Sequence, residues 1–177
     1  MKRLKPRVHV YTGEGEGKTI AAFGLALRAI GHGKRVLVVQ FLKGRKDVGE
    51  YKVQEKLQPL LEVQQFGKPH FINLAEPSPE DKELAQRALE YAKRALQAAE
   101  KPDVLILDEV NLAAHIGLVS VKDVLALIES APKDTTIVLT GRYAPKEFIE
   151  RADLVTEMRK LKHPFDKGIS AERGLEY

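Results

Sequence analysis

The sequence predicts an α/β fold in which a mostly parallel sheet carries helices on both faces. The run at 35–41 is continuously apolar through Val39, which is typical of a parallel strand covered on both faces, and mainly apolar runs at 8–12 and 103–109 are also expected to be buried strands. Stretches with helical periodicity separate these runs, so right-handed crossovers are expected between parallel strands. A glycine-rich turn at 12–19 joins the first apolar run to the first helical stretch. These observations favour one α/β domain over residues 1–177.

The first half of the chain is predicted to alternate strands and helices. The helix after the turn is expected at 18–31 and ends at 31–33, because glycine adopts the left-handed cap conformation at little cost. The apolar run at 35–41 is the second strand. A short helix is expected at 50–57, and partial alternation predicts a third strand at 60–66.

The second half begins with a long helix at 80–100, for which Ser78 is the expected cap and Pro79 the first helical residue. Its inward face is expected to carry Leu84, Ala88, Tyr91, Ala95 and Ala98. After the strand at 103–109 we expect a helix, a strand, a short helix and a last strand, at 119–130, 135–140, 144–151 and 153–158. The segment around His115 is assigned to no element, and residues 162–168 are too loop-like for the core.

Composition and charge narrow the classes of partner. The 29 basic and 25 acidic residues give a formal charge of +4, a mild bias that favours small anionic ligands and does not indicate nucleic acid. The chain has no cysteine, which excludes a disulfide, a thiolate metal site and a cysteine nucleophile. No apolar run approaches the roughly 18 residues that span a bilayer, and the N-terminus lacks the apolar core of a signal peptide. We therefore expect a cytoplasmic protein without a membrane partner.

The turn at 12–19 is a variant of the P-loop pattern G-x-x-x-x-G-K-[ST]. Gly17, Lys18 and Thr19 occupy the last three places of the pattern. Thr12 holds the first place, and the glycine expected there comes one position later, at Gly13. A strand before the turn and a helix after it are the context that the motif requires, so we prefer the motif to a chance glycine-rich turn.

The chemistry of this turn suits a chain of phosphates. Lys18 supplies a full positive charge, the following helix supplies orphan amides, and Thr19 offers a hydroxyl to a magnesium ion. The side chains of Glu14 and Glu16 are expected to point to solvent while the backbone faces the ligand. Glycines let the backbone amides converge into an anion nest. The glycines expected to do so are Gly13, Gly15 and Gly17.

A second landmark is the acid pair that ends the strand at 103–109. Four apolar residues lead into Asp108 and Glu109, which matches the Walker B pattern, so the two motifs predict a P-loop NTPase-like (RecA-like) fold. Glu109 is expected either to help hold the metal or to act as a base that activates water. Arg142, after a later strand, is expected to contact phosphate or to pair with one of the acids. For Lys43, after the second strand, a ligand contact and a solvated loop are equally open.

Taken together, the motifs resemble those of the P-loop type ATP:corrinoid (cob(I)alamin) adenosyltransferase family. The shifted glycine at Gly13, which weakens the general P-loop match, is the form found in that family. The motifs run in family order over almost the whole chain, and together they are highly specific. The matching stretches are 12–19, 21–24, 28–29, 31–34, 39–44, 107–109, 140–142, 152–153 and 162–166, with Gly174 near the end.

The resemblance implies that a Co(I) corrinoid attacks C5′ of ATP and that triphosphate leaves whole, in adenosylcobalamin synthesis or salvage. It implies ATP and a reduced corrinoid as substrates, a cobalt-reducing system with a reduced flavin donor, and a homodimer. The nucleotide would be bound by the loop, including Glu14 and Glu16, and by Arg28 and Arg142. The implied catalytic residues are Lys18, Thr19 and Glu109, and the implied Mg²⁺ ligands are Thr19, Asp108 and Glu109.

The chain departs from the family pattern in two places. Family members often carry a longer N-terminal segment over the site, whereas here only seven residues precede the first expected strand. The loop after the third strand often carries a Phe and a Trp that exclude the lower corrinoid ligand, and this chain has no Trp. Its counterpart contains His70 and Phe71, and Phe71 is expected to form the aromatic wall.

Two other classes of function use the same motifs. A RecA-like ATPase or a small-molecule kinase would use the same loop, with Glu109 as the base, and would release ADP where the transferase releases triphosphate. A nucleotide-binding regulator would bind ATP without turnover. The products formed from ATP distinguish these classes.

Overall fold

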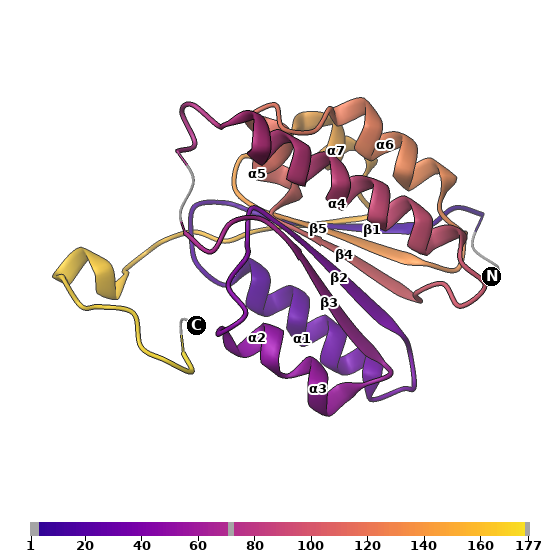
Figure 1. The fold of residues 1–177 in the computed structure, drawn as a ribbon, viewed down its shortest axis with the longest axis horizontal. Coiled ribbons are helices and arrows are strands. Elements are labelled where there is room, and N and C mark those ends of the chain that lie inside the picture. Colours follow the sequence, from indigo (N-terminus) through magenta and orange to yellow (C-terminus); the bar gives the residue numbers. More distant parts are fainter. Residues whose placement is uncertain (1–3, 71–72, 176–177) are drawn as a thin grey trace.

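The computed structural model describes residues 4–70 and 73–175, and it shows a six-stranded sheet in the order β3-β2-β4-β5-β1-β6 (Figure 1). All five strand pairs are parallel. The α/β class with a parallel sheet is therefore confirmed. The strands are β1 (Arg7–Thr12), β2 (Val36–Phe41), β3 (Leu61–Phe66), β4 (Val104–Asp108), β5 (Thr136–Thr140) and β6 (Leu154–Glu157). The helices are α1 (Lys18–Ile30), α2 (Gly49–Lys52), α3 (Gln54–Leu57), α4 (Pro79–Gln97), α5 (Val110–His115), α6 (Val121–Ser130) and α7 (Lys146–Arg151).

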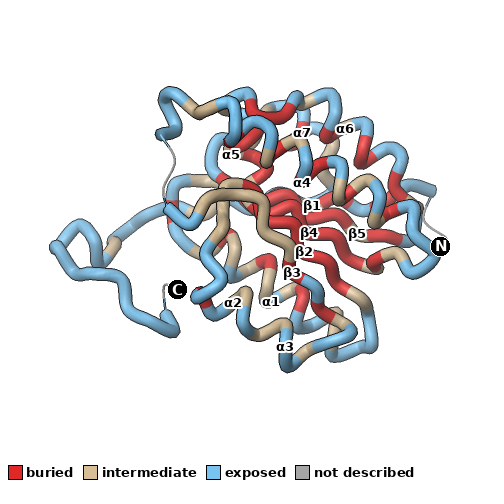
Figure 2. Tube along the Cα trace, viewed as in Figure 1, coloured by how far each residue is buried: buried red, intermediate tan, exposed pale blue. Residues whose placement is uncertain are grey.

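Helices cover both faces of the sheet, as the continuous apolar runs require. Helices α1, α2 and α3 lie on one face and α4 to α7 on the other (Figure 1). Alternate residues of each central strand enter the two cores: Leu105 and Leu107 pack on the side of α4, whereas Val104 and Ile106 pack on the side of α1. The strands are the most buried part of the molecule (Figure 2), and every residue of β2 is buried. Among the described residues, no helix is long and apolar enough to cross a membrane.

Several local predictions are confirmed by the structure. Ser78 caps α4 in a capping box with Asp81, and Pro79 is its first residue. Gly33 adopts the left-handed conformation after α1, with φ of 71°, while Gly31 itself stays helical. The tail forms only a short exposed 3₁₀ turn at Pro164–Lys167, outside the core as expected.

Other local predictions were wrong. The segment after Glu109, assigned to no element, is the helix α5, and the helix expected at 50–57 is two short helices. The inward face of α4 is rotated by about one residue from the expected stripe, because Tyr91 is only half-buried and directs its hydroxyl to Glu62 at the rim. The residues of α4 that are buried are Asp81, Ala85, Ala88, Leu89, Ala92 and Leu96.

This topology brings the chemically active segments to one edge of the sheet. The glycine-rich turn follows β1, the acid pair ends β4, and Lys43 follows β2. Strand β4 pairs with β2 and with β5, which in turn pairs with β1, so the carboxyl ends of these four strands meet. In open parallel sheets this edge is where ligands bind.

Candidate functional site

The turn between β1 and α1, here called the glycine loop (residues 12–19), is closed around the ammonium of Lys18. Lys18 is 7% exposed and donates hydrogen bonds from Nζ to the carbonyl oxygens of Gly13, at 2.8 Å, and Gly15, at 2.6 Å. Burial lowers its pKa, and the charge of Glu109 opposes that shift. Gly17, the N-cap of α1 with φ of 108°, has no side chain to occupy the first amides of the helix. The loop therefore presents a cation and a helix N-terminus to the same space.

Gly13 and Gly15 are also required because another segment of the chain packs against them, which the sequence did not predict. The chain leaving β6 crosses the loop so closely that a Cβ on Gly13 would lie 2.5 Å from the carbonyl oxygen of Met158. A Cβ on Gly15 would lie 2.7 Å from the carbonyl carbon of Arg159. The amide of Gly15 also donates to the carbonyl oxygen of Met158, at 2.7 Å. This amide is therefore bonded to the chain that follows β6 and does not contribute to the expected anion nest.

The two acidic residues of the glycine loop are exposed, as expected, and each has a basic partner. Glu14 lies 3.6 Å from a guanidinium nitrogen of Arg142, and Glu16 lies 3.1 Å from Nε2 of His163. Arg142 was expected to contact phosphate or to pair with an acid of β4. Its ion pair is with Glu14, although its charge also acts to lower the pKa of Glu109.

At the end of β4, Asp108 is wholly buried and accepts four hydrogen bonds from side chains. The donors are Thr19 Oγ1 at 2.9 Å, Thr140 Oγ1 at 2.6 Å, Gln40 Nε2 at 3.0 Å and Lys43 Nζ at 2.8 Å. Burial alone would raise the pKa of Asp108, but the charge of Lys43 and these hydrogen bonds hold the pKa below its usual value. The buried carboxylate is therefore ionised and fully compensated.

Glu109 differs from Asp108 in its backbone conformation and in the direction of its pKa shift. Its φ of 65° places a residue with a bulky side chain in the left-handed region, and its amide donates to Thr140 Oγ1 at 3.0 Å. Such strain is characteristic of functional sites. Burial and the nearby Asp108 raise the pKa of Glu109, while the charges of Lys43, Lys18 and Arg142 oppose the shift.

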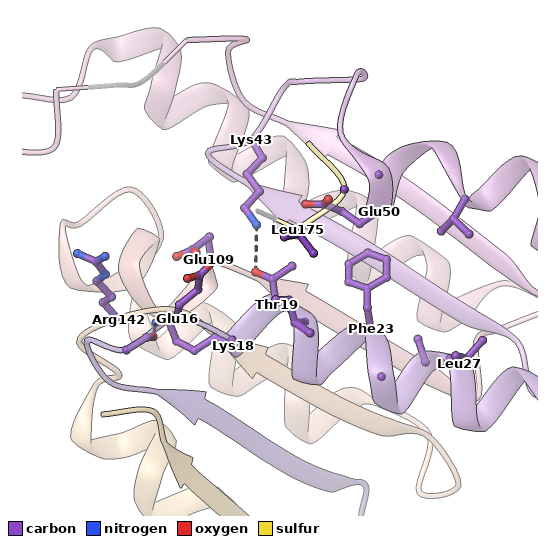
Figure 3. A pocket seen from close by; sticks show the side chains of 18 of the residues that line it. Glu16, Lys18, Thr19, Phe23, Leu27, Lys43, Glu50, Glu109, Arg142 and Leu175 are labelled. Atoms are coloured by element: carbon purple, nitrogen blue, oxygen red, sulfur yellow. Dashed lines mark hydrogen bonds between the residues drawn. The ribbon is translucent and has the colours of Figure 1, made fainter. Parts of the chain in front are cut away.

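Lys43, for which a ligand contact and a solvated loop were left open, is not simply solvated, because its side chain bonds to other residues of the site. Its Nζ lies 2.8 Å from Asp108 Oδ2 and 3.1 Å from Thr19 Oγ1, and Figure 3 shows the side chain reaching down to Thr19. Burial alone would lower the pKa of Lys43, but the carboxylates of Asp108 and Glu109 raise it. Lys43 is thus a cation held between a hydroxyl and a carboxylate.

These groups line a cavity of about 900 Å³, a size typical of small-molecule binding sites. The cavity has two chemically different parts. The charged half consists of Lys18, Thr19, Lys43, Glu109 and Arg142, with Asp108 buried beneath it. The apolar half consists of Phe23, Leu27 and Ile30 of α1, Val53 before α3, Leu57 of α3 and Leu175 of the tail. Figure 3 shows Phe23, Leu27 and Leu175.

Three of the predicted site residues lie elsewhere or are not described. Arg28 is exposed in the last turn of α1 and does not line the cavity, and neither does the exposed His70. Phe71 lies outside the described residues. The prediction missed Gln40, although an amide in an otherwise apolar strand is a signal, and it missed the contribution of the tail to the cavity wall. The tail residues in that wall are Lys160, His163, Phe165, Asp166, Gly174 and Leu175.

The donor set at the end of β4 fits a magnesium ion. Within the described chain, no cluster of three or more His, Cys, Asp or Glu forms a cage for a metal. Mg²⁺ typically uses one or two carboxylates together with substrate phosphates, and the Thr19 hydroxyl with Asp108 and Glu109 offers that kind of set. The ammonium of Lys43 marks a position between Thr19 and Asp108 where a cation is favoured.

Comparisons with known proteins show which family the sequence belongs to. The family model described as ATP:corrinoid adenosyltransferase BtuR/CobO/CobP matches residues 4–177. A corrinoid adenosyltransferase of Sinorhizobium sp is 38% identical over 175 residues, covering 98% of this chain and 81% of that protein. A corrinoid adenosyltransferase of Escherichia coli K12 is 36% identical over 168 residues, covering 95% and 84%. Corrinoid adenosyltransferase CobA of Salmonella typhimurium is 35% identical with the same coverage.

Proposed function

Because the chain belongs to the ATP:corrinoid adenosyltransferase family, we propose that the cavity at the carboxyl edge of the sheet is where it joins its two substrates. The protein is an enzyme that transfers the adenosyl group of ATP to a corrinoid. The named relatives do not favour the alternative of a RecA-like ATPase or a kinase. The observation that supports the location best is the convergence of Lys18, Thr19 and Glu109 beside an apolar wall.

The proposed reaction forms a cobalt–carbon bond and breaks the bond between C5′ and the triphosphate. The Co(I) centre of the corrinoid supplies both electrons of the new bond, and the triphosphate leaves with the electrons of the C5′–O bond. The cobalt is itself the nucleophile, so no side chain has to remove a proton. The task of the protein is to align the two substrates, to exclude water and to stabilise the leaving group.

We assign the leaving group to the charged half of the cavity. Charge that builds on the triphosphate would be met by the ammonium of Lys18, by the guanidinium of Arg142 and by the free amides at the start of α1. Preorganised donors of this kind stabilise a transition state because they need no rearrangement during the reaction. The glycine loop would thus bind ATP as a P-loop that holds an intact triphosphate.

Magnesium is the proposed cofactor, and its ligands would be Thr19, Asp108 and Glu109. When bound, the ion adds positive charge at the triphosphate as a Lewis acid. The raised pKa of Glu109 fits this role, because a carboxyl that is costly to ionise alone becomes ionised beside a divalent cation.

The proposal also includes partners that act outside the cavity. Co(I) forms only by reduction, so a cobalt-reducing system with a reduced flavin donor is required. We further propose a homodimer, on the pattern that the family resemblance implies, and a cytoplasmic setting in which ATP is available.

The direct test is an anaerobic incubation with ATP, Mg²⁺ and chemically reduced cobalamin or cobinamide. The expected products are a light-sensitive cobalt–carbon compound and triphosphate in equal amounts. A parallel incubation with unreduced corrinoid serves as the control and should give neither product. Release of ADP and phosphate without a cobalt–carbon bond would contradict the proposal and support an ATPase or kinase. Binding of ATP without any turnover would support a nucleotide-binding regulator.

A further inference from the structure

The ammonium of Lys43 occupies a position that the proposed function gives to another cation. Its Nζ donates to Asp108 Oδ2, at 2.8 Å, and to Thr19 Oγ1, at 3.1 Å. Thr19 Oγ1 in turn donates to Asp108 Oδ1, at 2.9 Å. The hydroxyl and the carboxylate are therefore tied together, with the ammonium contacting both.

A divalent cation on the same two groups would compete with the ammonium of Lys43. Magnesium lies about 2.0–2.1 Å from its ligands, and Thr19 Oγ1 is 3.1 Å from Lys43 Nζ, so an ion bound to that oxygen would be a close neighbour of the ammonium. Like charges at such short range repel each other. We therefore expect Lys43 and the metal to bind the oxygens of Thr19 and Asp108 in competition.

The backbone of Lys43 is held firmly, so any exchange has to occur through its side chain. Leu42 has φ of 62°, and the chain on either side of Lys43 packs directly on Gly67. A Cβ on Gly44 would lie 2.2 Å from the carbonyl oxygen of Gly67, and a Cβ on Gly67 would lie 2.3 Å from the carbonyl carbon of Leu42. The side chain itself is 29% exposed and lines the cavity, and its four methylenes are flexible.

We propose that Lys43 is an internal counter-cation of the nucleotide-free enzyme, which holds Thr19 and Asp108 in place and is displaced into the cavity when a divalent cation binds. This rests on the proposed function, because it concerns the same cation site. Lys43 keeps the buried Asp108 compensated in the empty enzyme. Once displaced, the ammonium faces the space assigned to the triphosphate, so the charge that leaves Asp108 becomes available to the leaving group. Lys43 is a positioning residue in this scheme.

The test uses Mn²⁺ as the probe and the nucleotide-free full chain. Lys43→Met removes the charge but keeps the bulk, and Lys46→Met, at an exposed position on the same loop, is the matched control. Free Mn²⁺ is measured by electron paramagnetic resonance at fixed pH and ionic strength. Lys43→Met should bind Mn²⁺ at least about tenfold more tightly than wild type, because one repelling charge is gone. Lys46→Met should match wild type.

A second measurement follows the unfolding temperature of the same proteins. Lys43→Met should unfold at a lower temperature than wild type without divalent cations, because Asp108 is left as an uncompensated buried charge. Millimolar Mg²⁺ should restore most of that loss, while wild type and Lys46→Met respond little. If Lys43→Met does not fold, Lys43→Gln keeps a donor for Asp108 without the charge and is tested in the same way.

Two results would overturn the inference. One is an affinity for Mn²⁺ in the Lys43 variants that equals or falls below that of wild type. The other is a loss of thermal stability that Mg²⁺ does not reverse. Neither measurement needs a corrinoid or turnover, so a failure here is distinct from a failure to form the cobalt–carbon product.

Discussion

The charged half of the cavity contains buried, hydrogen-bonded groups, whereas the apolar half presents exposed side chains. Asp108 is 0% exposed and accepts four hydrogen bonds, and Lys18 is 7% exposed. Leu27 and Leu175 of the apolar half are 62% and 67% exposed. The charged half lies where the carboxyl ends of β2, β4 and β5 meet the start of α1, while the apolar half is built on helix surfaces and the tail. From this difference we expect the charged half to be preorganised for the leaving group and the apolar half to be completed when the substrates bind.

The substitution expected to impair the charged half most is Lys18→Ala. The variant loses the cation that the glycine loop holds at the cavity wall, so kcat for adenosyl transfer should fall by a factor on the order of 10² to 10³. The measurement is the anaerobic rate of formation of the cobalt–carbon product at saturating ATP. Lys122→Ala, an exposed position on α6, is the control and should keep the wild-type rate. An undiminished kcat in Lys18→Ala would show that the loop only tethers the nucleotide.

A change in the apolar half should affect binding more than chemistry. Leu27→Ser removes an exposed apolar side chain from the cavity wall, so KM for ATP or for the corrinoid should rise about tenfold while kcat changes little. Initial rates with each substrate varied in turn show which of them the wall contacts. Ile149→Ser, on α7 at the opposite face of the sheet, should leave both KM values unchanged. A fall in kcat alone would contradict the division into two halves.

The smallest expected effect concerns stability and pH, through Glu109→Gln. Burial and Asp108 raise the pKa of Glu109 above its ordinary value of 4.5, so the folded protein binds this proton more tightly than the unfolded chain. As pH rises from that ordinary value through the raised pKa, the free energy of unfolding decreases. Below that range Glu109 is protonated in both the folded and the unfolded state, so it makes no contribution to the pH dependence. Glu109→Gln has no such proton to lose.

Glu109→Gln should therefore be more stable than wild type near pH 7.5 and equal to it near pH 4, without Mg²⁺ or nucleotide. Urea unfolding at the two pH values checks this expectation. Glu83→Gln, an exposed position on α4, should follow wild type at both. A Glu109→Gln variant that is less stable than wild type near pH 7.5 would mean that the carboxylate contributes to the charged half even without a cation.

Much of the fold could be predicted because its signals are local. Continuous apolar runs place the strands, and Ser78 with Pro79 places the start of α4. Helix α5 was missed because it is short, and because its N-cap, Glu109, has a left-handed conformation that no local pattern predicts. The face of α4 was misplaced since Tyr91 looks apolar in a pattern but keeps its hydroxyl at the rim.

The site divides in the same way. The sequence by itself determined the glycine loop, the acid pair and the edge at which they meet, because parallel strands bring their carboxyl ends together whatever the detailed packing. Only the tertiary structure decided that Lys43 lies on Asp108, 65 residues away, and that Arg142 pairs with Glu14. Only it showed that Met158 and Arg159 leave no room for a Cβ on Gly13 or Gly15. The reason is physical: spacing along the chain sets backbone direction, but the partner of a flexible charged side chain depends on which distant segments pack around it.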